Sequence, residues 1–325
     1  MRVSHQRTWI GLCFALFGAF FLHFSLGTVA VPLGTLFSDL FHWDTSSTAI
    51  LFRFPRSLAC VLAGGALGIA GSALQALFRN PIADPYVVGV SSGAAAGGAV
   101  AIYLGIGSAM GGLGVAAFGL VGGTLAILMV VLFARIRQVV TTESLLLSGV
   151  MIGAMFSSVL SLVLLAAGED TSTIFRWLLG SMTPAHLSKN GVMAITLLIG
   201  AGLLVGISKQ LNVLALGEES AKRMGIDAGR VRLIVLTAIT LMVSVTVGTV
   251  GIIGFLGLVA PHLARKLVGV DWRRSLIASG LIGAVLLSVA DVLAQRVIPD
   301  GGEVPVGIMT AILGAPFLLA LFRKT

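Results

Sequence analysis

Charged side chains are scarce in this sequence. Lysine, arginine, aspartate and glutamate together make up 10% of its 325 residues, against roughly a quarter in soluble domains. Hydrophobic residues make up 57%, and 42 glycines add to the uncharged share. Too little charge remains to cover a water-facing surface, so the composition excludes a soluble enzyme, a nucleic-acid-binding protein and a disordered chain. The sequence is typical of an all-α membrane protein that crosses the bilayer several times.

Several chemical motifs are also missing. The sequence has no Gly-Lys dipeptide, and therefore no Walker A motif, and it has no HExxH motif. Its two cysteines, Cys13 and Cys60, lie in apolar runs and form neither a disulfide framework nor a metal-binding pattern. We therefore expect no metal site, no bound cofactor and no catalytic residue. The sequence predicts a transport protein rather than a membrane-embedded enzyme.

Apolar stretches long enough to span a membrane, which takes about 20 residues, recur along the chain. Residues 233–270 form one stretch that is long for one span and short for two. Its glycines recur every third residue before Pro261, which suits a bend. The first stretch is expected to be a retained span, because no signal-peptide cleavage motif is clear. Besides residues 233–270, eight stretches qualify, of which the first is this retained span: Ile10–Val31, Leu58–Phe78, Tyr86–Ile106, Leu113–Phe133, Leu145–Ala167, Gly191–Ile207, Leu276–Val297 and Val306–Phe322.

The distribution of Lys and Arg decides the number of spans. If residues 233–270 cross twice, 16 of the 21 basic residues lie on the side of the N-terminus and 5 on the other. If they cross once, the split is 11 to 10. Because positive loops favour the cytoplasm, we expect one domain over residues 1–325 with ten spans and both termini cytoplasmic. The net charge of +8 then reflects these loops and not a nucleic-acid partner.

Ionisable groups inside spans would indicate an ion-coupled carrier. Asp291 is the one carboxylate well inside an expected span, four residues before Gln295 and five before Arg296. It is interpreted either as a local pairing or helix–helix contact, or as the coupling group of an ion-driven carrier that uses no ATPase. One shallow carboxylate is thin support for ion coupling, so we expect another subunit to supply the energy.

The expected inside loop Ser208–Arg232 is suited to contact such a subunit. Gly217 interrupts a mostly apolar segment, and a short helix follows with acidic residues first, basic residues last and Gly225 as its cap. The loop is expected to form a helix–glycine–helix elbow over about 211–226, although an ordinary ordered loop remains the alternative. Two i,i+4 ion pairs are expected on the short helix, Glu218 with Lys222 and Glu219 with Arg223.

Short residue strings from the second to the last expected span match one family in order. They include Arg53-Phe54-Pro55-Arg56, Gly71 to Gln75, Arg79-Asn80-Pro81, Leu216-Gly217-Glu218, Gly254 to Val259 with Pro261-His262, and Gly314-Ala315-Pro316-Phe317. On these motifs the chain resembles the FecCD-type permease subunits of bacterial ABC importers for iron–siderophore complexes, haem and vitamin B12. The first 50 residues match only as a generic span.

The resemblance implies the ten-helix fold of the vitamin B12 permease, in the bacterial cytoplasmic (inner) membrane. It implies a homodimer around the transport path, two ATP-binding cassette subunits that hydrolyse ATP with Mg²⁺, and a periplasmic or lipid-anchored substrate-binding protein. The chain itself would be a transport subunit in contact with lipid, without an ATPase site. An iron–siderophore complex is the first expectation for the cargo, with haem and cobalamin left open.

The resemblance also implies roles for individual residues. Docking of the binding protein falls on Arg53, Arg56 and Arg296, with lipid-phosphate contacts as the alternative. Coupling to the ATPase falls on Leu216, Gly217, Glu218, Ser220, Ala221, Arg223 and Gly225. The cytoplasmic gate falls on Asn80, Pro81, Thr141 and Thr142. Separately, Arg176 lies in an expected outer loop, where it is a candidate contact for an anionic siderophore or haem, or another docking or structural residue.

Overall fold

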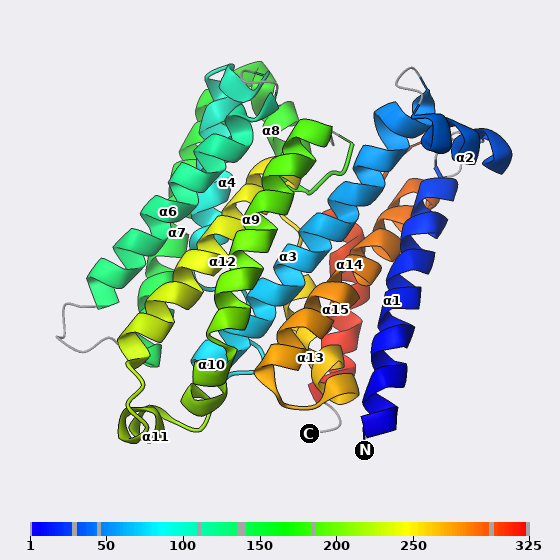
Figure 1. Ribbon diagram of the computed structural model, residues 1–325. Coiled ribbons are helices and arrows are strands. Elements are labelled where there is room, and N and C mark those ends of the chain that lie inside the picture. The colour runs from blue at the N-terminus through cyan, green and yellow to red at the C-terminus, as the bar shows by residue number, and fades with distance from the viewer. Residues whose placement is uncertain are drawn as a thin grey trace.

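A computed structural model describes residues 2–27, 31–43, 47–108, 112–134, 141–183, 186–298 and 302–322. Within these ranges the regular secondary structure is helical throughout. Figure 1 shows the long helices packed side by side in one bundle. The N-terminal end of α1 (Arg2–Ser25) and the C-terminal end of α15 (Val306–Phe322) lie at the same end, the lower end in Figure 1.

A helix lies in each range where the sequence predicts a span, although the first one, α1, runs over Arg2–Ser25 and not over Ile10–Val31. Seven helices are long and apolar enough to cross a membrane, whereas α4, α13 and α15 are shorter. The all-helical prediction is therefore confirmed. Between α1 and α15 the bundle helices are α3 (Phe54–Phe78), α4 (Val90–Tyr103), α6 (Gly114–Ala134), α7 (Thr142–Ala166), α9 (Leu187–Gly206), α12 (Ala228–Val250), α13 (Leu256–Val268) and α14 (Trp272–Arg296).

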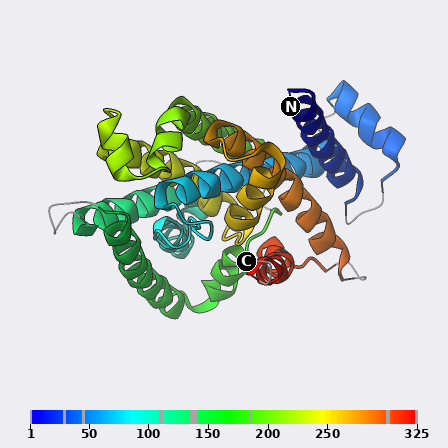
Figure 2. The same ribbon diagram turned by 90° about the horizontal axis from the view of Figure 1, so that it is seen from below.

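Short helices lie at the two ends of the bundle. At the upper end in Figure 1 lie α2 (Leu33–His42) and α8 (Thr171–Leu178), and at the lower end lie α10 (Ser208–Leu214) and α11 (Glu218–Arg223). Figure 2 shows α1 and α2 at one edge of the bundle and α6 and α7 at the opposite edge. The remaining short elements are η1 (Ala49–Arg53), η2 (Ile106–Ser108) and η4 (Gly168–Asp170).

The long stretch 233–270 is broken in two, as the sequence predicts. Helix α12 ends at Val250, Gly251 has φ 77°, and α13 starts at Leu256. The hydroxyl of Tyr86 accepts a hydrogen bond from the Ile253 amide at 2.7 Å, which satisfies a backbone group that the break leaves without a helical partner. Pro261 lies inside α13, so the break falls on the glycines and not at the proline.

Helices α3 and α14 pack with their backbones in contact. A Cβ placed on Gly64 would lie 2.3 Å from the carbonyl oxygen of Gly283, and one on Gly283 would lie 2.2 Å from that of Gly64. One turn further along α3, a Cβ on Gly68 would lie 2.2 Å from the carbonyl oxygen of Ser279. This is the small-residue packing that membrane helices use in place of hydrophobic attraction. Only hydrogen fits at these three glycines.

The same device joins the helices on the α6 side. Gly93 and Gly97 of α4 would place a Cβ within 2.5 Å of α6 carbonyl oxygens, and Gly123 of α6 would meet Ser244 of α12. Small residues four apart along a helix allow this close packing. By contrast, only 17% of the apolar window of α1 and 17% of that of α7 is buried, so these helices offer most of their surface to surrounding molecules.

Candidate functional site

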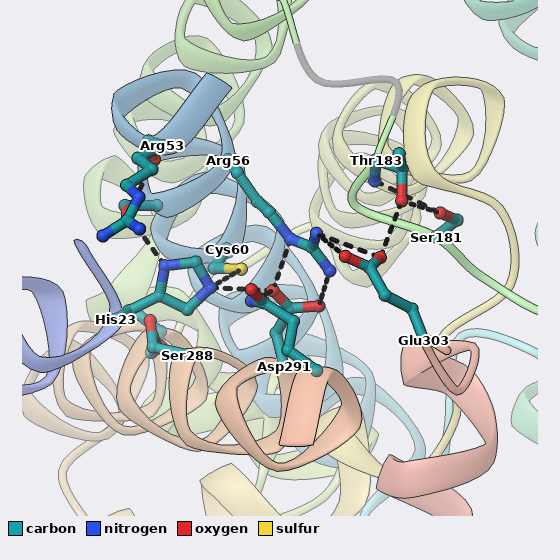
Figure 3. A network of polar contacts seen from close by, with 12 residues as sticks. His23, Arg53, Arg56, Cys60, Ser181, Thr183, Ser288, Asp291 and Glu303 are labelled. Atoms are coloured by element: carbon teal, nitrogen blue, oxygen red, sulfur yellow. Dashed lines mark hydrogen bonds and ion pairs between the residues drawn. The ribbon is translucent and has the colours of Figure 1, made fainter. Parts of the chain in front are cut away.

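A buried polar cluster, here called the Asp291 network, joins α1, α3, α14 and the segment before α15 at the upper end of the bundle (Figure 3). Arg56 donates from Nε to Oδ2 of Asp291 at 2.8 Å and from Nη2 to Oδ1 at 3.1 Å. Its Nη1 reaches the two carboxylate oxygens of Glu303 at 2.8 and 3.0 Å. Asp291 is only 1% exposed. One guanidinium therefore bridges two carboxylates from separate segments.

His23 completes the network from α1. Its Nδ1 lies 2.7 Å from Ser57 Oγ, and its Nε2 lies 2.7 Å from Asp291 Oδ2. Ser57 in turn donates from its hydroxyl to the backbone carbonyl of Arg53 at 2.9 Å. Since a carboxylate only accepts, the Nε2 N–H of His23 donates to Asp291. The buried carboxylate of Asp291 is therefore paired with Arg56 and hydrogen-bonded by His23, as its burial requires.

Three side chains of the network carry metal-ligand atoms. One atom each of His23, Cys60 and Asp291 lie within 4.8 Å of one another, and all three residues are buried. Oδ2 of Asp291, however, already accepts hydrogen bonds from His23, Arg56 and Gln295 Nε2, the last at 2.8 Å. The oxygen that a metal would use is thus occupied by three donors. We describe the group as a hydrogen-bonded network and not as a metal centre.

The two interpretations of Asp291 can be compared with its partners. The local pairing with Gln295 and the helix–helix contact are confirmed. The neighbouring Arg296 makes no ion pair with Asp291 among the described contacts, because it is exposed at the last residue of α14. Arg56 and His23, which lie 235 and 268 residues away in the sequence, contact Asp291 instead. Periodicity and spacing within one segment carry no signal for partners so distant.

A cavity of about 560 Å³ adjoins the Asp291 network. Arg56, Asp291 and Glu303 form part of its wall, and Arg176 of α8 lines it from the other side. Arg176 is exposed and has no hydrogen bond or ion pair to any other described residue. Thr183 donates to Glu303 at 3.1 Å and so holds the segment after α8 against the one before α15. The cavity therefore offers an unpaired guanidinium to a negatively charged group.

The three arginines expected to contact a binding protein all lie at the upper end, but they differ in availability. Arg56 is 14% exposed and is held by Asp291 and Glu303. Arg53 donates to the carbonyl oxygens of Phe24 and Ser25 at 3.3 and 3.0 Å, which anchors the end of α1. Arg296 is exposed. The docking prediction stays a prediction, and among the three Arg296 is the most accessible.

The elbow forms at the lower end as α10, Gly217 and α11. Gly217 has φ 124° and Gly225 has φ 71°, conformations that favour glycine, so these two residues fix the turns before and after α11. Ala221 is fully buried in the main hydrophobic core, so it holds α11 against the bundle. The turn after α11 is closed by the Ile226 amide, which donates to the Ala221 carbonyl at 2.9 Å. Leu216 is 74% exposed. The geometry confirms a helix–glycine–helix elbow with an apolar tip.

One of the two expected ion pairs on the elbow is wrong. Arg223 Nη2 lies 2.7 Å from Glu219 Oε1, as the i,i+4 spacing predicts. Glu218 instead pairs with Arg232 of α12. The guanidinium of Arg232 is only 9% exposed and needs a carboxylate close by, whereas Lys222 is exposed and is solvated by water. Glu218 therefore ties the elbow to α12 instead of stabilising α11 internally.

The four expected gate residues lie at the lower ends of α3 and α7. Asn80 and Pro81 follow α3, where the Asn80 carboxamide oxygen accepts from the Ile82 amide at 3.0 Å. Thr141 caps α7 by exchanging hydrogen bonds with Ser144, and Thr142 is the first helical residue. Among the described contacts no hydrogen bond joins the two pairs. In the same turn as Asn80, burial raises the pKa of Asp84 to about 6.

Comparison with known proteins places the whole chain in one group. Residues 15–324 match the FecCD transport family. An iron-uptake system permease protein, FeuC of Bacillus subtilis, is 34% identical over 96% of this chain and 97% of its own length. The cobalamin import system permease protein BtuC of Halobacterium salinarum is 35% identical over 83% of this chain and 72% of its own length.

A solved structure agrees with these relatives. An inward-facing metal-chelate type ABC transporter superposes with a TM-score of 0.86, covering 99% of this chain and all of the solved chain at 29% identity. The family resemblance and the multi-pass location in the cytoplasmic membrane, both expected from sequence motifs, are confirmed. This chain belongs to the FecCD transport family.

Proposed function

We propose that this chain is the membrane-spanning permease subunit of an ATP-driven importer for an iron–siderophore complex, haem or cobalamin. The observation that carries the proposal is the family match over residues 15–324, shared with permeases named for iron and cobalamin import. The subunit works as a homodimer, takes its energy from two ATPase subunits, and hydrolyses no ATP itself. A substrate-binding protein brings the cargo to the outer face.

The proposed topology has ten spans with both termini in the cytoplasm. The lower end of the bundle carries the ends of α1 and α15 and the elbow (Figure 1). It also carries most of the described basic residues, at the ends of helices, among them Lys222, Arg230, Arg265 and Arg273. Basic residues gather on the cytoplasmic side of membrane proteins. The Asp291 network then lies at the outer end.

The elbow α10–α11 is the proposed contact for the ATPase. Leu216 is 74% exposed and Met224 is 64% exposed, at an end of the bundle that faces water. Apolar side chains exposed beside charged ones are characteristic of a surface that another protein covers. The pair of Glu218 with the buried Arg232 attaches the elbow to α12, so movement of the ATPase is transmitted to a long helix instead of being absorbed in a loop.

The ion-coupled alternative is disfavoured by the surroundings of Asp291. A coupling carboxylate must exchange a proton or an ion during each cycle. Both oxygens of Asp291 instead accept hydrogen bonds from Arg56, and Oδ2 also accepts from His23. A carboxylate held by the guanidinium of Arg56 and by His23 is suited to join helices and not to release and rebind an ion.

Arg176 is proposed to attract anionic cargo at the outer cavity. Selectivity then rests mainly on the binding protein, and Arg176 would add a weak preference for carboxylate-bearing ligands. Haem uptake by vesicles containing Arg176→Ala is expected to fall several-fold, because an exposed guanidinium contributes up to about 1 kcal/mol to an ion pair. Uptake at the wild-type rate would remove Arg176 from the path.

Uptake into proteoliposomes tests the function as a whole. Vesicles would hold this chain and its ATPase with ATP inside, and the binding protein outside with radiolabelled ferric siderophore, haem or cobalamin in turn. Uptake of one cargo that stops without ATP is the expected result, and it names the substrate. Uptake that ignores ATP and follows a proton or sodium gradient would establish the carrier instead.

Reversing the charge of Arg296 tests the docking surface without disturbing the Asp291 network. Arg296→Glu is expected to slow association with the binding protein up to about fivefold, the effect of losing an exposed ion pair of about 1 kcal/mol. Association rates at low and high salt measure this, and the difference should shrink as salt rises. Arg273→Glu, at the opposite end, is the control. Equal rates for both variants would contradict docking at Arg296.

A further inference from the structure

A small basic pocket lies where the lower ends of α3, α13 and α14 meet the elbow. Its volume is about 230 Å³, and its wall includes Gln75, Arg79, Asn80, Ala215, Arg265 and Trp272. Ala215 belongs to the turn between α10 and α11, and Asn80 is one of the expected gate residues. The pocket, here called the Arg79–Arg265 pocket, therefore touches the elbow and the gate turn at the same time.

The wall of this pocket carries two guanidinium groups and no carboxylate. Arg265 Cζ lies 5.7 Å from the centre of the Trp272 ring, which holds the guanidinium in place. Nη1 of Arg265 is buried and has no hydrogen-bond partner among the described residues. Oε1 of Gln75, a residue 2% exposed, is unpartnered within the same described set. Buried groups left in this way are incomplete without a ligand or water.

The backbone of Arg79 is in an unusual conformation. Its φ of 50° lies in the left-handed region, which glycine normally occupies at the end of a helix. Arg79 stands at that position after α3, and the Asn80 amide donates to the Gln75 carbonyl at 3.2 Å. A strained residue persists where the surroundings hold it, and such residues gather at functional sites. Here the strain places a guanidinium under the elbow, with Nη1 3.7 Å from where a Cβ on Gly217 would lie.

Size and position indicate the occupant. A volume of about 230 Å³ is below the roughly 300–1,000 Å³ of pockets for whole small molecules, so a single side chain fits better. Two guanidinium groups select a carboxylate, because their planar donors match its two oxygens. The neighbouring Leu216, 74% exposed, supplies an apolar contact for the same partner. All of these features lie on the surface where the ATPase is proposed to dock.

We propose that the Arg79–Arg265 pocket receives an acidic side chain of the ATPase subunit. The inference rests on the proposed function, and it adds a second contact beside the elbow. The carboxylate binds Arg79 at the end of α3 and Arg265 at the end of α13. The ATPase then moves the gate turn Asn80–Pro81 directly, as well as through α10 and α11.

The test measures the affinity of the ATPase for this permease in detergent micelles, with both proteins full length. Arg79→Gln and Arg265→Gln are each expected to weaken binding roughly tenfold or more, the loss of a charge-assisted hydrogen bond. The double variant should be little weaker than either single variant, because both arginines bind one carboxylate. Arg273→Gln, an exposed arginine beside Trp272 and outside the pocket, is the matched control and should bind like the wild type.

Two further measurements identify the occupant. Thermal unfolding of each variant shows whether it is folded, and Arg79→Lys keeps the charge but lacks the planar fork, so it should still lose most of the affinity. Replacing the ATPase carboxylate that enters the pocket with arginine should restore binding to the Arg79→Glu permease. The same ATPase variant should not bind the wild-type permease as tightly as the wild-type ATPase does. That rescue would establish the carboxylate contact.

The contrary results are distinct. If the wild type binds the ATPase and both glutamine variants bind it equally well, the pocket proposal is wrong and the proposed function stands. If these variants instead lose bound anionic phospholipid, measured by mass spectrometry, a lipid headgroup is the occupant and the proposal is also wrong. If the wild-type permease binds no ATPase, both the pocket proposal and the proposed function are wrong.

Discussion

Asp291→Asn is expected to destabilise this protein by about 3–5 kcal/mol, the usual cost of leaving a buried charge without its partner. The substitution keeps the size of the side chain but removes its negative charge. Arg56 would then keep only Glu303, which lies at the edge of the network, and His23 would lose its carboxylate partner. Denaturation of the purified protein in detergent micelles, followed by circular dichroism, measures the change. Asp170→Asn, at the same end and exposed, is the control and should change stability little.

A double variant separates the ion pair from simple loss of packing. Arg56→Gln alone should also be strongly destabilising, because it leaves Asp291 with only His23 and Gln295 as partners. The double variant Arg56→Gln with Asp291→Asn should lower the free energy of unfolding by clearly less than the sum of the two single changes. In the double variant neither member of the Arg56–Asp291 pair remains as a charge without its partner. Strictly additive changes would show that Arg56 and Asp291 stabilise the fold independently, in contradiction to their 2.8 Å contact.

Gly64→Val is expected to prevent α3 and α14 from packing. A Cβ at Gly64 would lie 2.3 Å from a backbone carbonyl oxygen, and backbone cannot rotate away as a side chain can. Overpacking a core costs about 1–3 kcal/mol where side chains can adjust, and here the two helices must separate. We expect loss of folded protein, measured as monodisperse material after size-exclusion chromatography in detergent.

Gly202→Val provides the matched control for that experiment. Gly202 lies in α9, another long apolar helix, and a Cβ there would meet nothing within 4 Å. Yield and elution should therefore equal those of the wild type. If both variants behave alike, the close approach of α3 and α14 does not limit folding.

Patterns that are local in sequence predict much of this structure. The apolar stretches, the break near Gly251 and the elbow bounded by Gly217 and Gly225 depend on local spacing in the sequence, and each expected span contains a helix, although the first helix is displaced toward the N-terminus. Glycines four apart, such as Gly64 and Gly68, likewise indicate a close helix contact, although not with which helix. Helix periodicity and glycine's missing side chain are properties that a sequence displays directly.

The exposed pair Glu219–Arg223 follows from its i,i+4 spacing, but the partners of the charged residues that contact buried groups could not be predicted in the same way. Glu218 was expected to pair with Lys222 four residues away, yet the structure pairs it with Arg232, which is more buried. Asp291 had Arg296 as its nearest basic residue in the chain, but Arg56 reaches it across the α3–α14 contact. In both cases the more deeply buried cation takes the carboxylate. Burial is a property of the assembled bundle, so one sequence alone does not show it.

The Asp291 network also has a consequence for how the chain is made. His23 and Arg56 enter the membrane early in synthesis, whereas Asp291 lies 268 residues after His23. Until α14 is inserted, both basic side chains lack their carboxylate and are more stable near the aqueous interface. Helix α1, little buried elsewhere, can therefore lock to the bundle only when synthesis is nearly complete. Ribosome-bound chains that stop before residue 291 should carry a loosely attached first helix.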